Sequence, residues 1–481
     1  MSVRRVLLVL LCVGLSSIAA EADELRLKDG EILHGRIVEE QDGKLVVDAT
    51  TGRRTLRTTD VVERLEADAP RVELARRETA LVPEDDAGRE ALARFAWSRW
   101  LDEDFERLRV VPDGAWPAPW ERPGRTGKRW RRSRRDAAAQ RALLWLAAHQ
   151  EEDGRLDADG FSTHCPDGDV CGDPGGGHHG ERMPCGFDGV VTALAVMAWA
   201  ADGSTPVSGP HADAVARGVG ACRRVVHGGT RGFDGIWNLC FCVQALADVA
   251  CAARDPALLD DVEAGVASLL GQQRADGGWS YVYSIGDVPT TGCVLMALGQ
   301  AAQAGVAVDR GPIERALAFL EARVDTKTAR SEYHDGAERK GYTPTTANAA
   351  ATLAARAALG VLGDTPGLKR RIAGATGKKP KWKLEFKEVK TRDGRTVKAQ
   401  VGNLYPWAWY LASCALQRRS ASSGWLKGLA SALRAGQVKE GHAKGSWDPL
   451  GPYSLSGGRA FTTALGALML QEGHRYPDEG R

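Results

Sequence analysis

One stretch of the sequence concentrates side chains that could do chemistry. Cysteine and histidine residues stand among glycines between Phe161 and Phe187, namely His164, Cys165, Cys171, His178, His179 and Cys185. Thiolate sulfur and neutral imidazole nitrogen are ligands that Zn²⁺ prefers, so the loop is a candidate metal site with zinc as the candidate cofactor. The spacing matches no strong zinc motif. A disulfide among the three cysteines and a plain connector remain the alternatives.

The remaining cysteines favour a structural role. Of the 10 cysteines, Cys12 stands in an apolar N-terminal segment that we expect to be cleaved, so an odd number remains in the mature chain. At least one thiol is then free or binds something. Six lie on apolar helical stretches, where buried free thiols are common: Cys222, Cys240, Cys242, Cys251, Cys293 and Cys414.

Aromatic and acidic residues gather where apolar helices are expected to begin. The candidates for ligand binding are Asp188, Asp234, Tyr281, Tyr283, Asp287, Tyr342 and Trp407. Aromatic rings suit an apolar ligand or the face of a sugar, and paired carboxylates suit acid/base cleavage of a glycan. The alternatives are that the aspartates cap helix N-termini and that the rings fill gaps between repeats.

Alternating helices position these residues. The expected outer helices are amphipathic and cover 136–150, 211–227, 257–273, 311–323, 365–373 and 424–437. The expected inner helices are apolar and carry little charge, and they cover 188–201, 236–253, 290–304, 345–359, 404–417 and 460–471. A repeat of helix pairs about every 45 to 60 residues predicts a closed array, an (α/α)6 toroid of about six helix pairs.

A short motif marks the step from an outer to an inner helix. Its best copy runs from Gln273 to Trp279, and its glycines end the outer helix. Residues 150–156 form a copy with leucine in place of tryptophan, and residues 437–447 form a copy with extra residues. The sequence therefore resembles the prenyltransferase and squalene-cyclase repeat superfamily, of the terpenoid cyclase and protein prenyltransferase type, over residues 136–476. The resemblance implies an α/α toroid in which Gln273, Gly277 and Trp279 are structural.

The catalytic signatures of that superfamily do not carry over. The acidic Asp-x-Asp-Asp run of squalene-hopene-type cyclases is missing, and matching helix starts carry Thr290-Thr291 and Thr462-Thr463. The magnesium motif of ionising terpene synthases and the thioester motif of complement-type toroids are missing as well. Asp169-Val170-Cys171 has the spacing of a prenyltransferase zinc pair but lies in the first repeat. Whether the chain is an enzyme is therefore left open.

The rest of the chain completes the domain plan. Residues 1–22 read as a secretory signal peptide, 23–66 as a small SH3-like β-barrel, and 67–135 as a connector with short helices and a basic linker. Within the toroid of residues 136–476, residues 378–401 alternate like a β-hairpin insertion. No later segment looks long and apolar enough to span a membrane.

These features predict an exported protein, periplasmic or secreted. Lys+Arg is 64 against Asp+Glu 62, so the net charge gives no reason to expect nucleic acid. We expect a toroid that binds a lipid, glycan or protein ligand at one mouth. The alternative is an enzyme, either a terpenoid cyclase or transferase or a polysaccharide-active (α/α)6 lyase or hydrolase.

Overall fold

The computed structural model divides the chain into two compact units, residues 1–111 with 207–210, and residues 112–206 with 211–481. The residues that it describes are 23–28, 32–49, 52–65, 70–82, 85–99, 101–116, 136–171, 186–229, 235–282, 284–325, 327–335, 345–376, 379–390, 396–400, 404–417, 423–451 and 454–475. The predicted signal peptide lies outside them.

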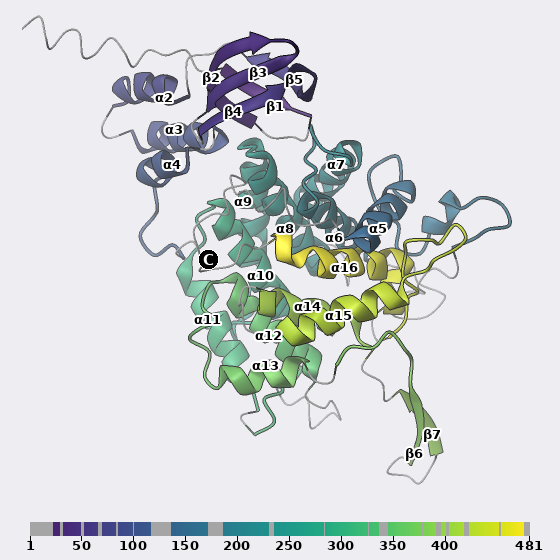
Figure 1. Cartoon of the computed structure of the whole chain (residues 1–481). Helices are drawn as coiled ribbons and strands as arrows, with labels where there is room; N and C mark the ends of the chain where they lie inside the picture. Colours follow the sequence, from purple (N-terminus) through teal and green to yellow (C-terminus); the bar gives the residue numbers. More distant parts are fainter. Residues whose placement is uncertain are drawn as a thin grey trace, which may run out of the picture. The chain divides into compact units, whose positions relative to one another are not determined.

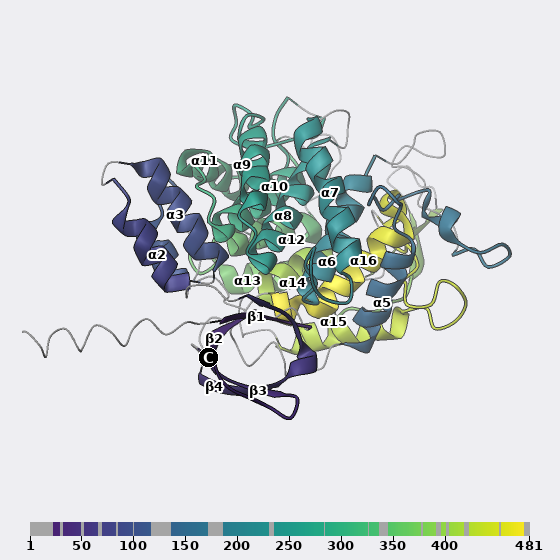
Figure 2. The same ribbon diagram turned by 90° about the horizontal axis from the view of Figure 1, so that it is seen from above.

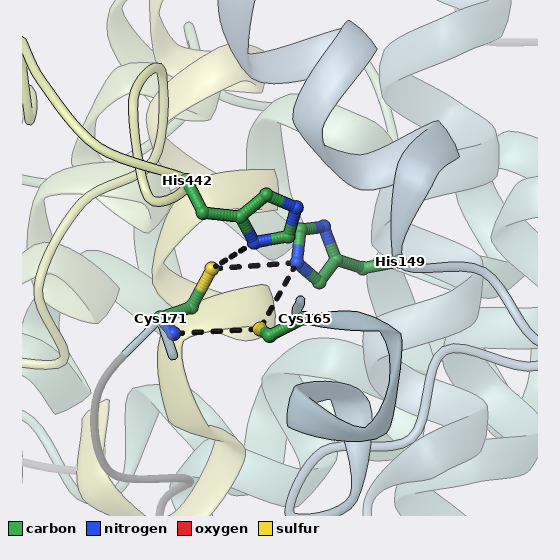
Figure 3. Close-up of side chains that lie close together, drawn as sticks. All are labelled: His149, Cys165, Cys171 and His442. Carbon is green, nitrogen blue, oxygen red and sulfur yellow. Dashed lines mark hydrogen bonds between the residues drawn. The ribbon is translucent and has the colours of Figure 1, made fainter. Parts of the chain in front are cut away.

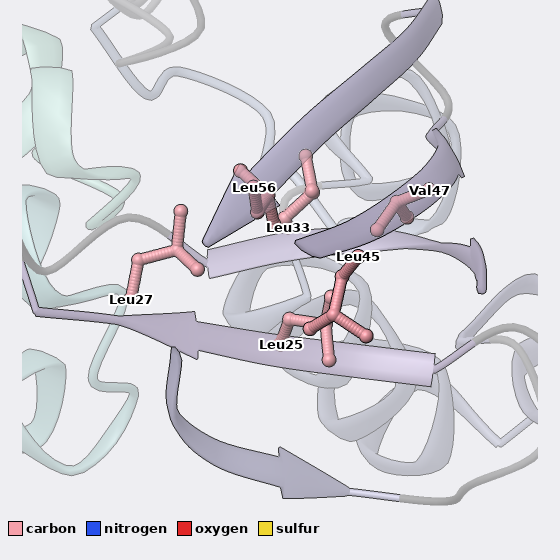
Figure 4. Packing of buried hydrophobic residues seen from close by; sticks show 6 residues of the cluster. All are labelled: Leu25, Leu27, Leu33, Leu45, Val47 and Leu56. Atoms are coloured by element: carbon pink, nitrogen blue, oxygen red, sulfur yellow. The ribbon is translucent and has the colours of Figure 1, made fainter. Parts of the chain in front are cut away.

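The first unit contains an antiparallel sheet with strand order β4-β3-β2-β1-β5. Its strands are β1 (Asp23–Leu27), β2 (Ile32–Gln41), β3 (Lys44–Ala49), β4 (Gly52–Arg57) and β5 (Val61–Leu65). The alternation in the sequence places one set of apolar side chains on a shared face, where they form the buried cluster Leu25, Leu27, Leu33, Leu45, Val47 and Leu56 (Figure 4). Asp42 and Gly43 join β2 to β3 with φ of 52° and 73°, the left-handed backbone that a two-residue hairpin turn requires.

Three short helices follow the sheet in this unit: α2 (Pro70–Thr79), α3 (Asp86–Ser98) and α4 (Asp102–Leu108). The Asp85 side chain caps α3 by accepting a hydrogen bond from the Gly88 amide at 2.8 Å. The guanidinium of Arg77 on α2 lies 4.1 Å from the centre of the Phe95 ring on α3. This contact joins the two helices through a cation–π interaction.

The centre of the second unit is a closed ring of inner helices. These helices, as far as the described residues show them, are α6 (Asp188–Ala201), α8 (Gly235–Ala253), α10 (Val288–Ala304), α12 (Thr346–Ala358), α14 (Pro406–Gln417) and α16 (Ser454–Arg475). Each packs against the next, and α16 packs back against α6 (Figure 1). Their small residues permit this closeness: a Cβ on Gly299 of α10 would lie 2.5 Å from the Ala358 carbonyl oxygen of α12.

The outer helices cover this ring. They are α5 (Ala137–Ala148), α7 (Ala212–Gly228), α9 (Ala257–Leu270), α11 (Arg310–Glu321), α13 (Leu368–Thr376) and α15 (Ser423–Gly436). Most lie over a boundary between two inner helices, as α7 does over α6 and α8, and α13 over α12 and α14 (Figures 1 and 2). The packing confirms the expected (α/α)6 toroid, and the helix bounds differ from the expected ones by only a few residues in most cases.

Glutamines at the ends of outer helices join one repeat to the next. In each described copy of the motif, the side-chain amide donates to the carbonyl of the motif glycine and to a carbonyl of the following outer helix. Gln273 bonds Gly277 at 2.9 Å and Pro312 of α11 at 2.8 Å. The equivalent pairs are Gln150 to Gly154 and Ala214, and Gln437 to Gly445 and Ala138. The last pair runs from α15 to α5, so the motif also closes the ring.

Threonines of the inner helices hold the residue that ends the motif. The Thr291 hydroxyl accepts a hydrogen bond from the Trp279 backbone amide at 2.9 Å, and Thr463 does the same for Trp447 at 3.2 Å. In the first copy Thr192 accepts from the Leu156 amide at 2.8 Å. Leucine therefore preserves the backbone contact where it replaces tryptophan.

The inserted hairpin is shorter than expected. Its strands are β6 (Phe386–Lys390) and β7 (Thr396–Gln400), which pair with each other. Trp382, assigned to the hairpin by its alternation with charged residues, instead packs in the toroid. Its ring centre lies 6.1 Å from that of Trp409 and 6.5 Å from that of Trp447. The apolar contact with those rings outweighs continuation of the strand.

The expectation that no later segment is long and apolar enough to cross a membrane was wrong for α8, which alone among the described helices meets both criteria. It packs against α6, α7, α9 and α10, and most of its side chains are buried among them. Helix α8 thus has the surroundings of a core helix.

Candidate metal centre and the inner-helix starts

Two cysteines and two histidines meet at one point of the toroid. The potential ligand atoms of His149, Cys165, Cys171 and His442 all lie within 4.8 Å of one another (Figure 3). The Cys171 sulfur lies 3.4 Å from Nε2 of His149 and 3.1 Å from Nδ1 of His442, and the Cys165 sulfur lies 3.7 Å from Nε2 of His149. In a tetrahedral zinc site, nitrogen and sulfur ligands are about 3.5 Å apart, given the usual bond lengths. These spacings suit a zinc-sized ion.

His149 is prepared to act as a ligand. It caps the C-terminus of α5 and is buried, with its ring centre 3.9 Å from that of Trp145. Its Nδ1 lies 2.7 Å from the Trp145 carbonyl oxygen, an acceptor, so Nδ1 carries the proton and Nε2 presents its lone pair to the sulfurs. Burial lowers the pKa of His149 to about 4, although the Trp145 carbonyl opposes this shift. The imidazole is therefore neutral at pH 7, as metal binding requires.

The two cysteines are free thiols in the structure and form no disulfide with each other. Cys165 follows a short 3-10 helix, η3 (Phe161–His164), and its sulfur accepts a hydrogen bond from the Cys171 amide at 3.4 Å. Burial and the neighbouring Cys165 raise the pKa of Cys171 to about 11. Without a cation such a thiol keeps its proton at pH 7, whereas a bound metal removes it.

His442 comes from the other end of the repeat array. It lies between α15 and α16, where its backbone amide donates to Oδ2 of Asp169 at 2.9 Å. Asp169 thus holds the loop that carries His442 instead of supplying a metal ligand. Its resemblance to the aspartate of the prenyltransferase pair goes no further than spacing.

The sequence identified two of these four residues. His164 was expected in the same site but is not one of the four. Its Nε2 lies 3.0 Å from Oε1 of Glu151, and its ring centre lies 6.5 Å from that of His149. His178, His179 and Cys185 lie outside the described residues. The sequence did not identify His149 and His442. His442 stands among the extra residues of the last motif copy, and that insertion could have indicated a site there.

The inner helices begin at one end of the ring, which we call the mouth. Asn238 near the start of α8 donates to the Gly186 carbonyl just before α6, at 2.6 Å. The Val288 amide at the start of α10 bonds the Tyr333 carbonyl at 2.8 Å, and the Thr345 amide before α12 bonds the Ser331 carbonyl at 3.3 Å. These bonds bring neighbouring helix starts together.

Aromatic rings meet across the mouth. Trp237 of α8 and Trp407 of α14 come from opposite sides of the ring of helices, yet their ring centres are 6.1 Å apart. The ring centres of Phe241 and Phe461 lie 5.9 and 6.1 Å from that of Trp407, and these three residues are buried. Tyr281 lies 6.3 Å from Trp237, and both are half-buried. The rings therefore form an aromatic floor across the axis of the toroid. Its half-buried members, Trp237 and Tyr281, reach solvent.

Carboxylates also stand near the mouth. Oxygens of Asp157, Asp159 and Asp188 lie within 4.8 Å of one another. Asp188 begins α6, where its carboxylate accepts from the Ala158 amide at 3.0 Å and from Arg155 at 2.9 Å. Burial raises the pKa of Asp188 to about 6, with Asp157 adding to the shift, and the Ala158 amide and Arg155 lower it in part.

The other acidic and aromatic candidates have different surroundings. Asp287 is fully buried and caps α10 by accepting from the Thr290 amide at 2.8 Å. The Tyr281 hydroxyl lies 2.7 Å from the Tyr333 hydroxyl, which gives the mouth a polar pair beside the aromatic floor. Asp234, Tyr283 and Tyr342 lie outside the described residues.

The Asp287→Asn variant should reveal the buried carboxyl in its pH dependence. Burial raises the pKa of Asp287 from 3.8 to about 6, although hydrogen bonds from Thr290 and Ser280 oppose it. A raised pKa means that the carboxyl stabilises the fold most below pH 4 and that this contribution disappears as the pH rises through 6. Asparagine keeps the cap but does not titrate.

Denaturant unfolding at several pH values measures this effect. The unfolding free energy of the wild type, minus that of the variant, should fall by roughly 2 kcal/mol between pH 4 and pH 7. A difference that is constant over this range would contradict the assignment.

Comparisons with known proteins find similar structures but assign the chain to no family. No family model matches the chain, and no curated protein matches it. Among solved structures it is similar to a type II terpene cyclase from Scytonema, at 15% identity and a TM-score of 0.43, over 70% of this chain and 96% of that one.

It is also similar to a mannanase and a mannosidase. One is an α-1,6-mannanase of Salegentibacter, at 13% identity and a TM-score of 0.43, over 69% of this chain and 98% of that one. The other is a glycoside hydrolase family 76 mannosidase from Bacteroides thetaiotaomicron, at 11% identity and a TM-score of 0.44, over 70% of this chain and 99% of that one. The assignment of this chain as an (α/α)6 toroid rests on its own helix packing.

Proposed function

We propose that the protein is an exported toroid that binds a ligand or partner at its mouth and lacks the acid motif of squalene cyclases. The observation that carries the proposal is the aromatic floor, whose half-buried members Trp237 and Tyr281 present ring surface beside the Tyr281–Tyr333 hydroxyl pair. Apolar walls with a few fixed polar groups are typical of ligand sites. The ligand class that fits is a lipid with an oxygenated end, or the apolar face of a sugar.

The helix starts support binding over cyclase chemistry. In squalene-hopene-type cyclases a strong acid stands at the start of an inner helix. The corresponding Thr291 here is buried and holds the Trp279 amide, and Thr463 holds the Trp447 amide. These hydroxyls are used by the fold and provide no acid for protonating an alkene.

A second candidate function follows from Asp188. A carboxyl group with a pKa near 6 is suited to general acid catalysis, and other carboxylates lie close by. Its bonds to Arg155 and the Ala158 amide favour a structural role instead. Hydrolysis of an α-linked glycan that disappears in Asp188→Asn, while the helical circular dichroism is retained, would favour this candidate.

Native mass spectrometry of the full chain purified from its producing cells tests the binding proposal. We expect a bound small molecule in the wild type, depletion of that molecule in Trp237→Ala, and its retention in Leu144→Ala, which changes an exposed residue of α5. A wild type that carries no ligand, and whose melting temperature no lipid extract or oligosaccharide raises, would overturn the proposal.

Export and the role of the sheet are parts of the same proposal. The apolar segment before Ala22 supports cleavage near Asp23, which N-terminal sequencing of the mature protein would detect. The five-strand order of the first unit is compatible with an SH3-like barrel that spaces or anchors the toroid. A mature chain that retains Met1 would contradict the export assignment.

A further inference from the structure

We propose that His149, Cys165, Cys171 and His442 bind one Zn²⁺ ion, which joins the first and last repeats of the toroid and thereby holds the ring closed. The proposal rests on the convergence of the four ligand atoms within 4.8 Å. Two thiolates and two imidazoles form a complete tetrahedral donor set. Because all four positions are then taken by protein, the ion is structural and leaves no open site for a substrate.

The position of the ligands explains what the metal does. His149 ends α5, the first outer helix, and Cys165 and Cys171 stand between α5 and α6. His442 stands between α15 and α16, in the last repeat. The sulfur of Cys171 and Nδ1 of His442, 3.1 Å apart, bridge residues that are separated by 271 positions in the chain. The ion would therefore cross the one seam that the chain itself does not connect.

Two insertions supply these ligands. From Gln273 to Trp279 the motif spans seven residues, whereas from Gln437 to Trp447 it spans eleven, and His442 lies in the added part. Likewise, Trp279 is followed closely by α10 at Val288, whereas Leu156 and α6 at Asp188 are separated by the segment with both cysteines. Because the two insertions meet at the same seam, we infer that together they form one metal site.

Other contacts at the seam show what remains without the metal. The side-chain amide of Gln437 donates to the Ala138 backbone carbonyl at 2.7 Å, and Arg141 donates to the side-chain oxygen Oε1 of Gln437 at 2.7 Å. An equivalent contact joins another pair of repeats, where Arg315 donates to the side-chain oxygen of Gln273 at 2.6 Å. The metal is thus an addition at this seam, so its loss should loosen the first and last repeats and leave much of the helical structure in place.

The experiment measures metal content and stability of the full chain, purified under reducing conditions and reconstituted with Zn²⁺. We expect one zinc per chain in the wild type, and cobalt substitution should give the visible absorption of a tetrahedral thiolate site. Removal of zinc by a chelator should lower the melting temperature by roughly 5 °C or more and expose the 157–171 segment to protease.

Variants separate a metal ligand from a residue needed only for packing. His442→Ala should lose most of the zinc, whereas His442→Cys offers sulfur in its place and should retain it. His164→Gln is the matched control, because its side chain lies near the site but outside the four ligands. Equal zinc content in wild type and His442→Ala would overturn the proposal, as would a Cys165–Cys171 disulfide found by mass spectrometry in protein purified without reductant.

Discussion

Replacing Trp279 by alanine is expected to lower the free energy of unfolding by about 3 to 5 kcal/mol, the range found for truncation of large buried aromatic residues. The side chain is fully buried, and its indole nitrogen donates to the Leu269 carbonyl of α9 at 2.7 Å. Its backbone amide is held by Thr291 of α10 at 2.9 Å. Trp279 therefore connects an outer helix to the next inner helix, and its removal leaves a cavity at that seam.

Chemical denaturation followed by circular dichroism measures this loss. Trp279→Phe is the informative partner, since phenylalanine fills part of the cavity but removes the indole hydrogen bond to the Leu269 carbonyl, which keeps the Gln272 amide as a donor at 3.1 Å. We expect it to fall between the wild type and the alanine variant. An alanine variant as stable as the wild type would contradict the structural role of the motif.

Alanine at Gly445 should destabilise the seam between the last and first repeats by about 2 to 5 kcal/mol, from left-handed backbone strain and overpacking combined. Gly445 has a φ of 96°, and a Cβ there would lie 2.6 Å from the Arg141 carbonyl oxygen of α5. The same constraints meet at Gly277, with φ of 86° and 2.8 Å to the Arg315 carbonyl oxygen. Glycine is thus required where the motif loop approaches the backbone of the next outer helix closely.

Thermal and denaturant unfolding of Gly445→Ala test this requirement. Gly424→Ala is the control, because a Cβ at Gly424 of α15 would meet nothing within 4 Å. We expect the control to change stability by less than about 1 kcal/mol, in the stabilising direction if helix propensity dominates. Equal stability of the two variants would show that the seam adapts to the added methyl group.

The helices of the toroid were predictable because their signals are local. An amphipathic outer helix, a glycine stop and an apolar inner helix follow one another within each repeat, so each boundary is written in a few neighbouring residues. Trp382 shows the limit of such reasoning. It alternates with charged residues as a strand residue would, but its ring contacts Trp409 and Trp447, which the chain supplies later.

The candidate metal site was only half predictable for the same reason. Cys165 and Cys171 stand in one loop and attract notice together. His442 reaches them only because α16 packs against α6 and closes the ring, a contact that no local pattern reveals. His149 precedes the motif glutamine at the end of an ordinary outer helix, so it carried no separate signal.

X-ray absorption spectroscopy at the zinc edge, on the full chain in solution, is the most direct test of the metal-closed ring. Tetrahedral coordination by Cys165, Cys171, His149 and His442 predicts two sulfur ligands at about 2.3 Å and two nitrogen ligands at about 2.0 Å from the ion. In His442→Cys, which should retain zinc, the ligands should change to three sulfurs and one nitrogen. A zinc ion surrounded by oxygen alone, or a reconstituted protein that holds no zinc, would contradict the account.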